Sequence, residues 1–287
     1  MGLTHIRTPK NFVLEERLER YARAIETHPE HLAGHWAHAC YPLETPLQEP
    51  DAHPNTRQYE RVHLDLGCGK GSFIIQSAQR DPRTLFIGMD TEPICIAYAA
   101  QGICASELPN AIVTPRGAHA VEQIFSPGEI DAITLNFSTP YPKAHDVRRR
   151  LTTIEHLMAY RHVLAPGGTL TLRTDSQPLR DWSLIQLDAA GYETLWVSDD
   201  VRTNHPDIPE TEYETRLREN GAHVWGVCAT PGVDPTEEML ARGREANPSL
   251  MTYLPDDLDT LDYVPLGMEA AVLNARNRRR RAAERNR

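Results

Sequence analysis

The residues from Asp65 to Gly71 have the types and spacing of a ligand-binding turn. An apolar segment, residues 62–66, runs into Gly67-Cys68-Gly69-Lys70-Gly71, and apolar positions at helical spacing follow. Glycine permits the positive φ angles of such a turn and lets a ligand approach the backbone, while the next helix start offers unpaired N–H groups. The pattern therefore predicts a strand, a glycine turn and a helix that bind a nucleoside.

The spacing of the glycines narrows the choice of nucleoside. The dinucleotide fingerprint G-x-G-x-x-G requires glycine where this chain has Ser72. The pattern here, G-x-G-x-G after Asp65, is similar to the S-adenosylmethionine loop of Rossmann-like methyltransferases. Asp65 is then expected to face the cationic methionine end. Asp90 ends the next apolar run, about 20 residues further on, where an acid usually binds ribose hydroxyls. The alternative is a glycine-rich turn that binds nothing.

Composition sets limits on the class of protein. The chain has 287 residues, 40% of them apolar, which suits one large α/β domain with additions. A net charge of −10 excludes a uniformly positive nucleic-acid surface, so any RNA contact must use local basic patches. No leader opens the chain, and no apolar run approaches the roughly 20 residues of a membrane span. The five cysteines, without a C-x-x-C pair, indicate reduced thiols and a cytoplasmic protein without membrane attachment.

The order of predicted elements indicates the fold class. Short apolar strands alternate with helices, which predicts an α/β fold with a mostly parallel sheet covered by helices on both faces. With the loop above, the chain resembles the Rossmann-like methyltransferases, and that resemblance implies a sheet of seven strands. The predicted strands are 62–66, 85–89, 111–114, 130–137, 169–173 and 193–197, and the helices between them include 94–104, 152–163 and 179–189.

The two ends of the chain form predicted additions to a domain of residues 61–230. Residues 1–60 contain a predicted helix, 12–25, and then repeated prolines at 29, 42, 46, 50 and 54. His28, His31, His35 and His38 could bind a metal if they lay on one helix, although surface or packing histidines are the simpler interpretation. Residues 231–287 end in a predicted helix from Met268 with clustered arginines, which are either solvated or bind RNA phosphate.

A second stretch whose residues could bind a ligand or take part in catalysis is Asn136-Phe137-Ser138-Thr139-Pro140-Tyr141-Pro142-Lys143. It follows a strand, and its prolines fix the loop so that side chains at its rim stay aimed at a ligand. A basic run, Arg148–Arg150, comes next, and with Lys143 and Arg161 it could contact RNA while Tyr141 or Trp182 stacks on a base. Trp182 falls in an amphipathic helical pattern, however, and a core position is the favoured interpretation for it. A stiff turn beside a solvated helix start is the alternative.

With these motifs the chain resembles the bacterial tRNA guanine-N7 methyltransferases, particularly the form of Gram-positive bacteria. The resemblance extends from about Pro29 to Val227. The motif around Asn136 and the T-x-Y-E box at Thr211 are specific, whereas the glycine loop and Pro166-Gly167-Gly168 occur in many methyltransferases. The other matching segments are Pro29-Glu30, Gly34-His35-Trp36, Phe86-Ile87-Gly88 with Asp90, Arg149–Thr152 and Arg173-Thr174-Asp175.

The resemblance implies a role for each matching residue. It places Asp175 at the catalytic site and implies tRNA as the substrate partner, with methylation at N7 of a guanine in the variable loop. The cofactor it implies is S-adenosylmethionine, held by Asp65, Gly67, Gly69, Gly71, Asp90, Gly117 and Ala118. The residues implied to hold the guanine nucleotide are Lys143, Asp175, Thr211, Glu212, Tyr213 and Glu214. No metal is implied, and the expected state is a monomer or homodimer.

Two positions depart from the family pattern. Thr139 stands where the family has the aspartate credited with catalysis, and Gly117 stands where an aspartate contacts the cofactor. Guanine N7 has a free lone pair and no proton to remove, so alignment with the methyl group can suffice. We therefore expect a slow enzyme. The alternatives are a non-catalytic RNA-binding relative and a methyltransferase for another substrate.

Overall fold

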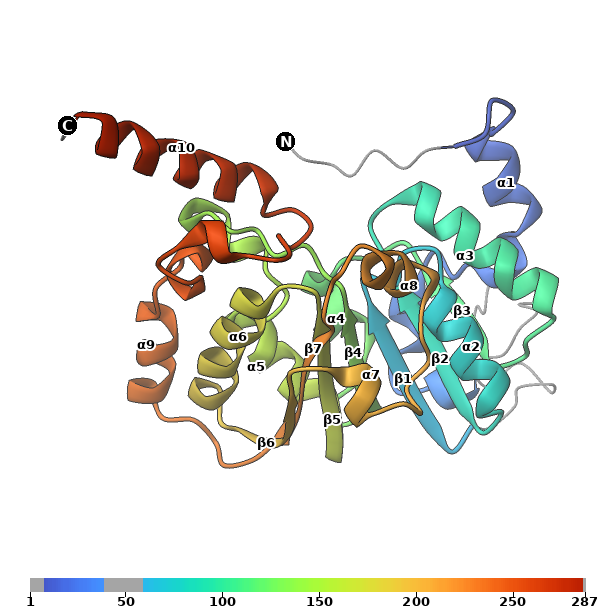
Figure 1. Ribbon diagram of the computed structural model, residues 1–287. Helices are drawn as coiled ribbons and strands as arrows, with labels where there is room; N and C mark the ends of the chain where they lie inside the picture. The colour runs from blue at the N-terminus through green and yellow to red at the C-terminus, as the bar shows by residue number, and fades with distance from the viewer. Residues whose placement is uncertain (1–7, 39–58, 286–287) are drawn as a thin grey trace. The chain divides into compact units, whose positions relative to one another are not determined.

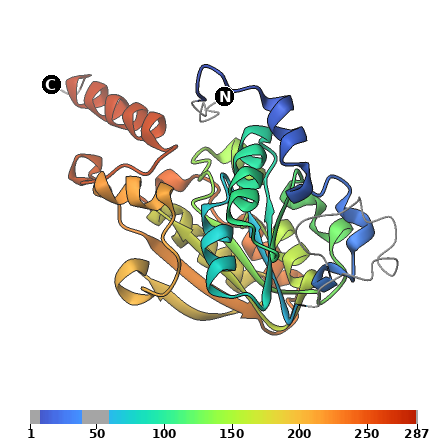
Figure 2. The same ribbon diagram turned by 90° about the vertical axis from the view of Figure 1, so that its right-hand side faces the viewer.

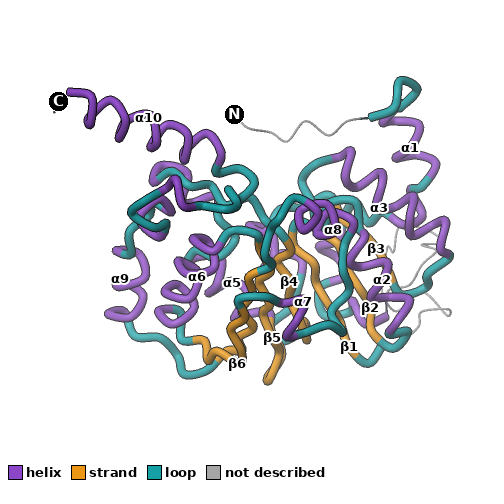
Figure 3. Tube along the Cα trace, in the orientation of Figure 1, coloured by secondary structure: helices purple, strands orange, loops and turns teal. Residues whose placement is uncertain are grey.

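The computed structural model describes residues 8–38 and 59–285, and seven strands in this part of the chain form one sheet. The strand order is β3-β2-β1-β4-β5-β7-β6 (Figure 1, Figure 3). Strand β1 pairs in parallel with β2 and β4, β2 pairs in parallel with β3, and β6 is antiparallel to β7. This confirms the predicted α/β class and its mostly parallel sheet. The strands are β1 Arg61–Leu66, β2 Thr84–Met89, β3 Ala111–Thr114, β4 Ile130–Asn136, β5 Leu164–Thr174, β6 Tyr192–Ser198 and β7 Trp225–Pro231.

The six strands expected from the sequence are all present, and every one except β5 agrees with its expected bounds to within one residue. Strand β5 begins at Leu164 instead of residue 169, so the strand includes Pro166-Gly167-Gly168, in which Gly167 has a φ of 77°. Strand β4 stops at Asn136, because Phe137 takes a φ of 52°. The seventh strand, β7, was not among the six expected strands; its run Trp225-Gly226-Val227-Cys228-Ala229 is apolar and buried in the middle.

Helices fill the intervals between strands. Two of them show why they begin where they do: the Glu92 carboxylate accepts the N–H of Ile94 at the start of α3, and the Ser176 hydroxyl accepts the N–H of Leu179 at the start of α6. Each also has proline in its first turn, a position that needs no N–H donor. The helices are α1 Leu14–Arg20, α2 Ser72–Arg80, α3 Pro93–Ser106, α4 Val121–Ile124, α5 Ile154–Val163, α6 Gln177–Ala189, α7 Val201–Asn204, α8 Glu212–Glu219, α9 Glu237–Glu245 and α10 Glu269–Arg285.

The chain divides into two compact units. The first comprises Met1–Asn136, Met158–Thr171 and Pro209–Thr211, and the second comprises Phe137–Leu157, Leu172–Ile208 and Glu212–Arg287. The division predicted from sequence, at residues 60 and 230, stays a prediction.

The core of the first unit lies along its central parallel strands. Leu64, Ile87 and Ile133 on three neighbouring strands are fully buried, as expected for strands covered on both faces. Helix α1 lies against α3 (Figure 1, Figure 2). The predicted helix over residues 12–25 is shorter than expected, because the chain leaves α1 at Tyr21, forms a 3₁₀ turn, and becomes extended at Ile25, which bridges to Val113 in β3.

The histidines at 28, 31, 35 and 38 do not lie on one helix. Two 3₁₀ turns, η2 (Pro29–Leu32) and η3 (Trp36–His38), are separated by Gly34 with a φ of 81°. The four histidines therefore do not share one helical face. Residues 8–38 and 59–285 contain no group of three or more His, Cys, Asp or Glu placed to hold a metal ion. The prolines at 42, 46, 50 and 54, Cys40 and Arg287 lie outside the described residues.

In the second unit the C-terminal extension, residues 231–287, packs on α6. Leu250, Met268 and Val272 join Leu179 and Trp182 in one buried cluster. Trp182 is therefore a core residue, not a surface for stacking a base. The described cysteines, at 68, 95, 104 and 228, are buried. None of the helices that the structure describes is long and apolar enough to cross a membrane.

Candidate functional site

The glycine turn between β1 and α2 has the geometry that its sequence predicts. Gly67, Gly69 and Gly71 have φ angles of 75°, 54° and 78°, which L side chains rarely adopt. A Cβ on Gly71 would also lie 2.8 Å from the Cβ of Ala99, so helix α3 leaves no room for a side chain there. A Cβ on Gly69 would meet nothing within 4 Å, so the turn is open on that side to an approaching ligand.

Asp90 braces this turn directly. Its Oδ2 accepts the backbone N–H of Gly69 at 2.9 Å, and its Oδ1 accepts that of Glu92 at 2.8 Å. Burial raises the pKa of Asp90, while these backbone bonds act in the opposite direction. The structure thus places the predicted ribose-binding acid at the glycine turn, where it also fixes the turn's shape.

Asp65 is 1% exposed and forms the second carboxylate of this region. Its Oδ1 accepts the Thr134 hydroxyl at 2.9 Å and the Asn136 amide at 2.7 Å, both from strand β4. Burial raises the pKa of the Cys68 thiol most, and the charges of Asp90 and Asp65 raise it further, so both carboxylates lie close to this thiol. The two predicted cofactor carboxylates therefore converge on the glycine turn. Thr134, which helps to orient Asp65, belongs to no motif, whereas Asn136 opens the Asn136–Lys143 stretch that the sequence singled out.

Gly117 and Ala118 lie at the 3₁₀ turn η5 (Ala118–Ala120) after β3. A Cβ on Gly117 would lie 2.9 Å from the ring of His119 and 3.0 Å from Cγ2 of Thr91. An aspartate at this position would require the exposed His119 ring to move. In this chain the His119 imidazole occupies the space that a side chain of residue 117 would need, and glycine at 117 leaves that space to the imidazole.

In the second unit, the loop Phe137–Lys143 is held in a strained shape. Phe137 and Tyr141 both have positive φ, 52° and 46°, which costs about 1–3 kcal/mol each and is common at functional sites. The N–H of Phe137 donates to the Arg173 carbonyl at 2.8 Å. Thr139 and Lys143, the two predicted site residues of this loop, are exposed at its rim.

Arg150 is the residue that fixes this loop, a role that the sequence did not reveal. It is fully buried, and its guanidinium donates to the carbonyls of Pro140 at 3.1 Å, Tyr141 at 2.7 Å and Pro248 at 2.6 Å. Burial lowers its pKa to about 10. The predicted basic run is thus divided: Arg148 and Arg149 are exposed, whereas Arg150 is structural.

Asp175 follows strand β5 and is 5% exposed. Its Oδ2 accepts the Tyr263 hydroxyl at 2.7 Å and the Leu266 backbone N–H at 2.8 Å. Burial raises the pKa of Asp175, and the two hydrogen bonds oppose that shift. Both donors belong to the C-terminal extension, so residues distant in sequence build the surroundings of this predicted site residue.

The T-x-Y-E box, residues 211–214, has two exposed residues in the middle and a buried residue at each end. Glu212 and Tyr213 are exposed, and the Tyr213 ring lies 5.6 Å from that of Phe137. Glu214 is fully buried, with ion pairs to Arg173 at 3.1 Å and Arg202 at 2.5 Å. Glu214 therefore anchors α8 within the second unit.

Thr211 belongs to the first unit and is nearly buried. The carbonyl of the preceding residue, Glu210, accepts a hydrogen bond from the Gln76 side-chain amide at 2.7 Å. Glu210 is thereby bonded to α2, the helix that follows the glycine turn.

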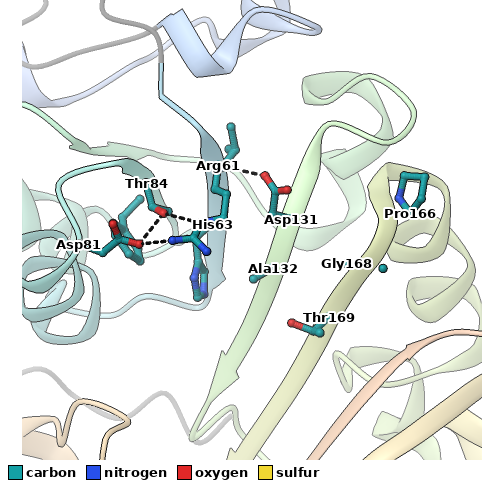
Figure 4. A pocket seen from close by; sticks show the side chains of 12 residues that line it. Arg61, His63, Asp81, Thr84, Asp131, Ala132, Pro166, Gly168 and Thr169 are labelled. Carbon is teal, nitrogen blue, oxygen red and sulfur yellow. Dashed lines mark hydrogen bonds and ion pairs between the residues drawn. The ribbon is translucent and has the colours of Figure 1, made fainter.

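A cavity of about 450 Å³ opens at the amino ends of β1, β2 and β4 (Figure 4). Its charged residues already bind one another or the backbone: Arg61 pairs with Asp81 at 2.8 Å, and Asp131 accepts the N–H of Val62 at 2.8 Å. It lies at the opposite end of β1 from the glycine turn. It is therefore distinct from the carboxylate-lined turn, where we locate the candidate site.

Comparisons with known proteins show which family the chain belongs to. Residues 59–227 match the model of a family described as "Putative methyltransferase". A tRNA (guanine-N(7)-)-methyltransferase of Streptococcus equi subsp. zooepidemicus is 30% identical over 226 residues, 78% of this chain and 100% of the relative. One of Levilactobacillus brevis is 33% identical over 195 residues, 67% of this chain and 83% of the relative. The crystal structure of the 16S rRNA methyltransferase KamB has a TM-score of 0.49 at 18% identity, covering 61% of this chain and 89% of its own.

Proposed function

The chain belongs to the putative methyltransferase family that includes the tRNA (guanine-N(7)-)-methyltransferases, and from that premise we propose that it methylates N7 of a guanine in tRNA. The observation that carries the proposal is that Asp65 and Asp90 lie at an open glycine turn. The residues that match the family, 59–227, include this turn. The position of the guanine, which the sequence suggests is in the variable loop, is part of the proposal.

The first unit fits S-adenosylmethionine. When bound, this cofactor supplies an electrophilic methyl group on a sulfonium. Gly69 leaves open space above the turn, Asp90 offers carboxylate oxygens for ribose hydroxyls, and Asp65 offers a negative charge for the cationic methionine end. Gly67 and Gly71 permit the backbone shape, and Gly117 with Ala118 completes the proposed contact region.

The second unit supplies the proposed base-binding groups. Once N7 carried the methyl group that the bound cofactor would supply, the purine ring would be cationic. Asp175 can accept base N–H groups and offset this charge, because it is held as an oriented, nearly buried carboxylate. Lys143 and Glu212, both exposed, and Tyr213 complete the proposed nucleotide contacts of this unit, and Glu214 anchors the helix that carries Glu212 and Tyr213. Thr211, which belongs to the first unit, is a further proposed contact.

Basic residues of the second unit favour an RNA substrate. Lys143, Arg148 and Arg149 are exposed on the loop segment, and Arg278–Arg281 are exposed on α10. Against the net charge of −10, such local clusters are what phosphate contacts require. Location in the cytoplasm and a monomeric or dimeric state are further parts of the proposal.

The experiment is transfer of labelled methyl from S-adenosylmethionine to unmodified tRNA by the purified protein, with the product nucleoside identified by mass spectrometry. We expect N7-methylguanosine, formed slowly, because Thr139 carries no charge to assist. Deleting the gene should lower N7-methylguanosine in tRNA. Binding of the cofactor without any transfer to tRNA would overturn the proposal and favour an RNA-binding relative or another substrate.

A further inference from the structure

The segment Tyr263–Glu269 of the C-terminal extension lies on the predicted base-binding residues of the second unit. The Tyr263 hydroxyl and the Leu266 N–H both bind Oδ2 of Asp175, at 2.7 and 2.8 Å. A Cβ on Gly267 would lie 3.4 Å from Pro140 and 3.9 Å from Cγ2 of Thr139. One segment therefore contacts both Asp175 and the loop that carries Thr139.

This segment is firmly anchored. Met268, which lies within it, is fully buried beside Leu179 and Trp182 of α6, and the Ser176 hydroxyl lies 3.3 Å from its sulfur. Earlier in the C-terminal extension, the N–H of Leu250 donates to the Pro142 carbonyl at 3.0 Å. Because the Met268 side chain is buried in this apolar cluster, the segment is a packed part of this unit.

Glu269 brings a carboxylate to the same place. Its Oε2 accepts the N–H of Gly267 at 2.7 Å, and Gly267 is the residue next to Thr139 and Pro140. Glu269 is exposed, so its charge is available to a ligand. In each of Asp175, Tyr213 and Tyr263, burial raises the pKa most and the charge of Glu269 raises it further.

We propose that this segment completes the base-binding site: Tyr263 is a positioning residue that orients Asp175, and Glu269 supplies beside Thr139 the carboxylate that the loop lacks. The inference rests on the proposed function. A carboxylate there offsets the positive charge that develops on the purine, a contribution that the Thr139 hydroxyl cannot make. The C-terminal extension is then part of the enzyme's chemistry.

The first test is a rescue experiment. Glu269→Gln should lower kcat for tRNA methylation by about 10–10²-fold, with the Kd for S-adenosylmethionine unchanged. Adding Thr139→Asp to Glu269→Gln should restore most of the rate, because the charge returns from the neighbouring loop. Glu284→Gln, at the far end of the same helix, is the matched control. An unchanged kcat in Glu269→Gln, or no rescue by Thr139→Asp, would overturn the role of Glu269.

The second test concerns Tyr263. Tyr263→Phe removes a hydrogen bond that lowers the pKa of Asp175, so the acid limb of the kcat/KM profile should move to higher pH. Tyr253→Phe, which removes another hydroxyl of the C-terminal extension, should leave the profile in place. If the segment instead blocks Asp175, Tyr263→Phe will raise kcat, and the positioning role is wrong.

A binding measurement keeps this inference separate from the proposed function. The probes are 7-methylguanosine monophosphate, whose base is cationic, and guanosine monophosphate, whose base is neutral. The protein should prefer the cationic nucleotide, and Glu269→Gln should reduce that preference about tenfold, by calorimetry. If the wild-type protein transfers no methyl but shows this charge-dependent preference, the proposed function fails and the inference stands. Equal preferences in both proteins would overturn the inference whatever the methylation assay shows.

Discussion

The hydroxyl of Tyr263 donates a 2.7 Å hydrogen bond to Oδ2 of Asp175, although 88 positions separate the two residues. Asp175 follows strand β5, and Tyr263 precedes helix α10, so the bond joins an acid at a strand end to an appended segment. A buried carboxylate with two oriented donors keeps one fixed direction. Through this bond the C-terminal extension becomes part of the proposed site.

Asp90→Asn should weaken binding of S-adenosylmethionine. The amide can accept only one of the two backbone N–H groups that the carboxylate now binds, and it loses the charge that favours ribose hydroxyls. Loss of charged hydrogen bonds of about 1.5–3 kcal/mol corresponds to roughly 10–150-fold in Kd. Calorimetry measures the change, with the exposed Glu122→Gln as control. An unchanged Kd would place the cofactor elsewhere.

Thr139→Asp alone should raise the rate of methyl transfer. It adds a carboxylate beside the base, where one such group is worth at most about 10²–10³ in rate. With Glu269 already present we expect a rise of roughly tenfold. Single-turnover assays on unmodified tRNA measure it. Thr139→Asn has the shape of aspartate without its charge, and a similar rise in that variant would contradict the electrostatic explanation.

Glu214→Gln should destabilise the fold. The change removes the buried carboxylate charge that pairs with the guanidiniums of Arg173 and Arg202, and breaking a buried ion pair in this way costs about 3–5 kcal/mol. Urea denaturation gives the difference in free energy of unfolding. Glu212→Gln is the control, because Glu212 on the same helix is exposed and lies 3.9 Å from its partner Arg216, a pair worth about 0–1 kcal/mol. Equal effects would show that the buried pairing is unimportant.

Stability should fall as the pH drops from about 6.5 towards 4, partly through His63. Burial, and then the charge of Arg61, lowers the pKa of His63 to about 4, while an unfolded histidine titrates near 6.5. Between these values the unfolded state binds more protons, so stability that is present above about pH 6.5 decreases in acid, on the order of 1–3 kcal/mol. His63→Phe, whose ring suits the neighbouring Phe73 and Phe86, should show a smaller decrease between pH 7 and pH 5. An identical decrease would contradict this assignment.

The arginines of α10 should contribute to tRNA affinity in a salt-dependent way. Arg279 and Arg280 are exposed, and replacing both with glutamine should weaken tRNA binding and reduce the slope of log affinity against log salt by roughly 1 for each phosphate that is no longer neutralised. Arg242→Gln with Arg244→Gln, on helix α9, is the matched control, because these arginines already pair with Asp188 and Glu155. Equal slopes in the two double variants would show that α10 binds no phosphate.

The sequence by itself determined the elements whose cause is local. A glycine turn with positive φ can be predicted from Gly67, Gly69 and Gly71, because only glycine adopts such angles freely, and apolar runs such as residues 62–66 and 85–89 predict buried parallel strands. The same local logic placed Asp65 and Asp90 beside the turn. It could not decide how the histidines between 28 and 38 are arranged, because a shared face required one helix, and Pro29 and Gly34 interrupt it.

The tertiary structure alone decided which polar side chains serve as partners and which as surface. Arg150 lies next to the exposed Arg149 in sequence, yet it is buried and holds the carbonyls of Pro140 and Tyr141. Tyr263 and Glu269 carry no motif, and their relation to Asp175 and Thr139 exists because an apolar cluster fixes the C-terminal extension against α6. Backbone conformation depends on neighbours along the chain, whereas burial and hydrogen-bond partners depend on packing between distant segments. The sequence therefore predicts the glycine turn and the strands, but not the partners of Arg150, Tyr263 and Glu269.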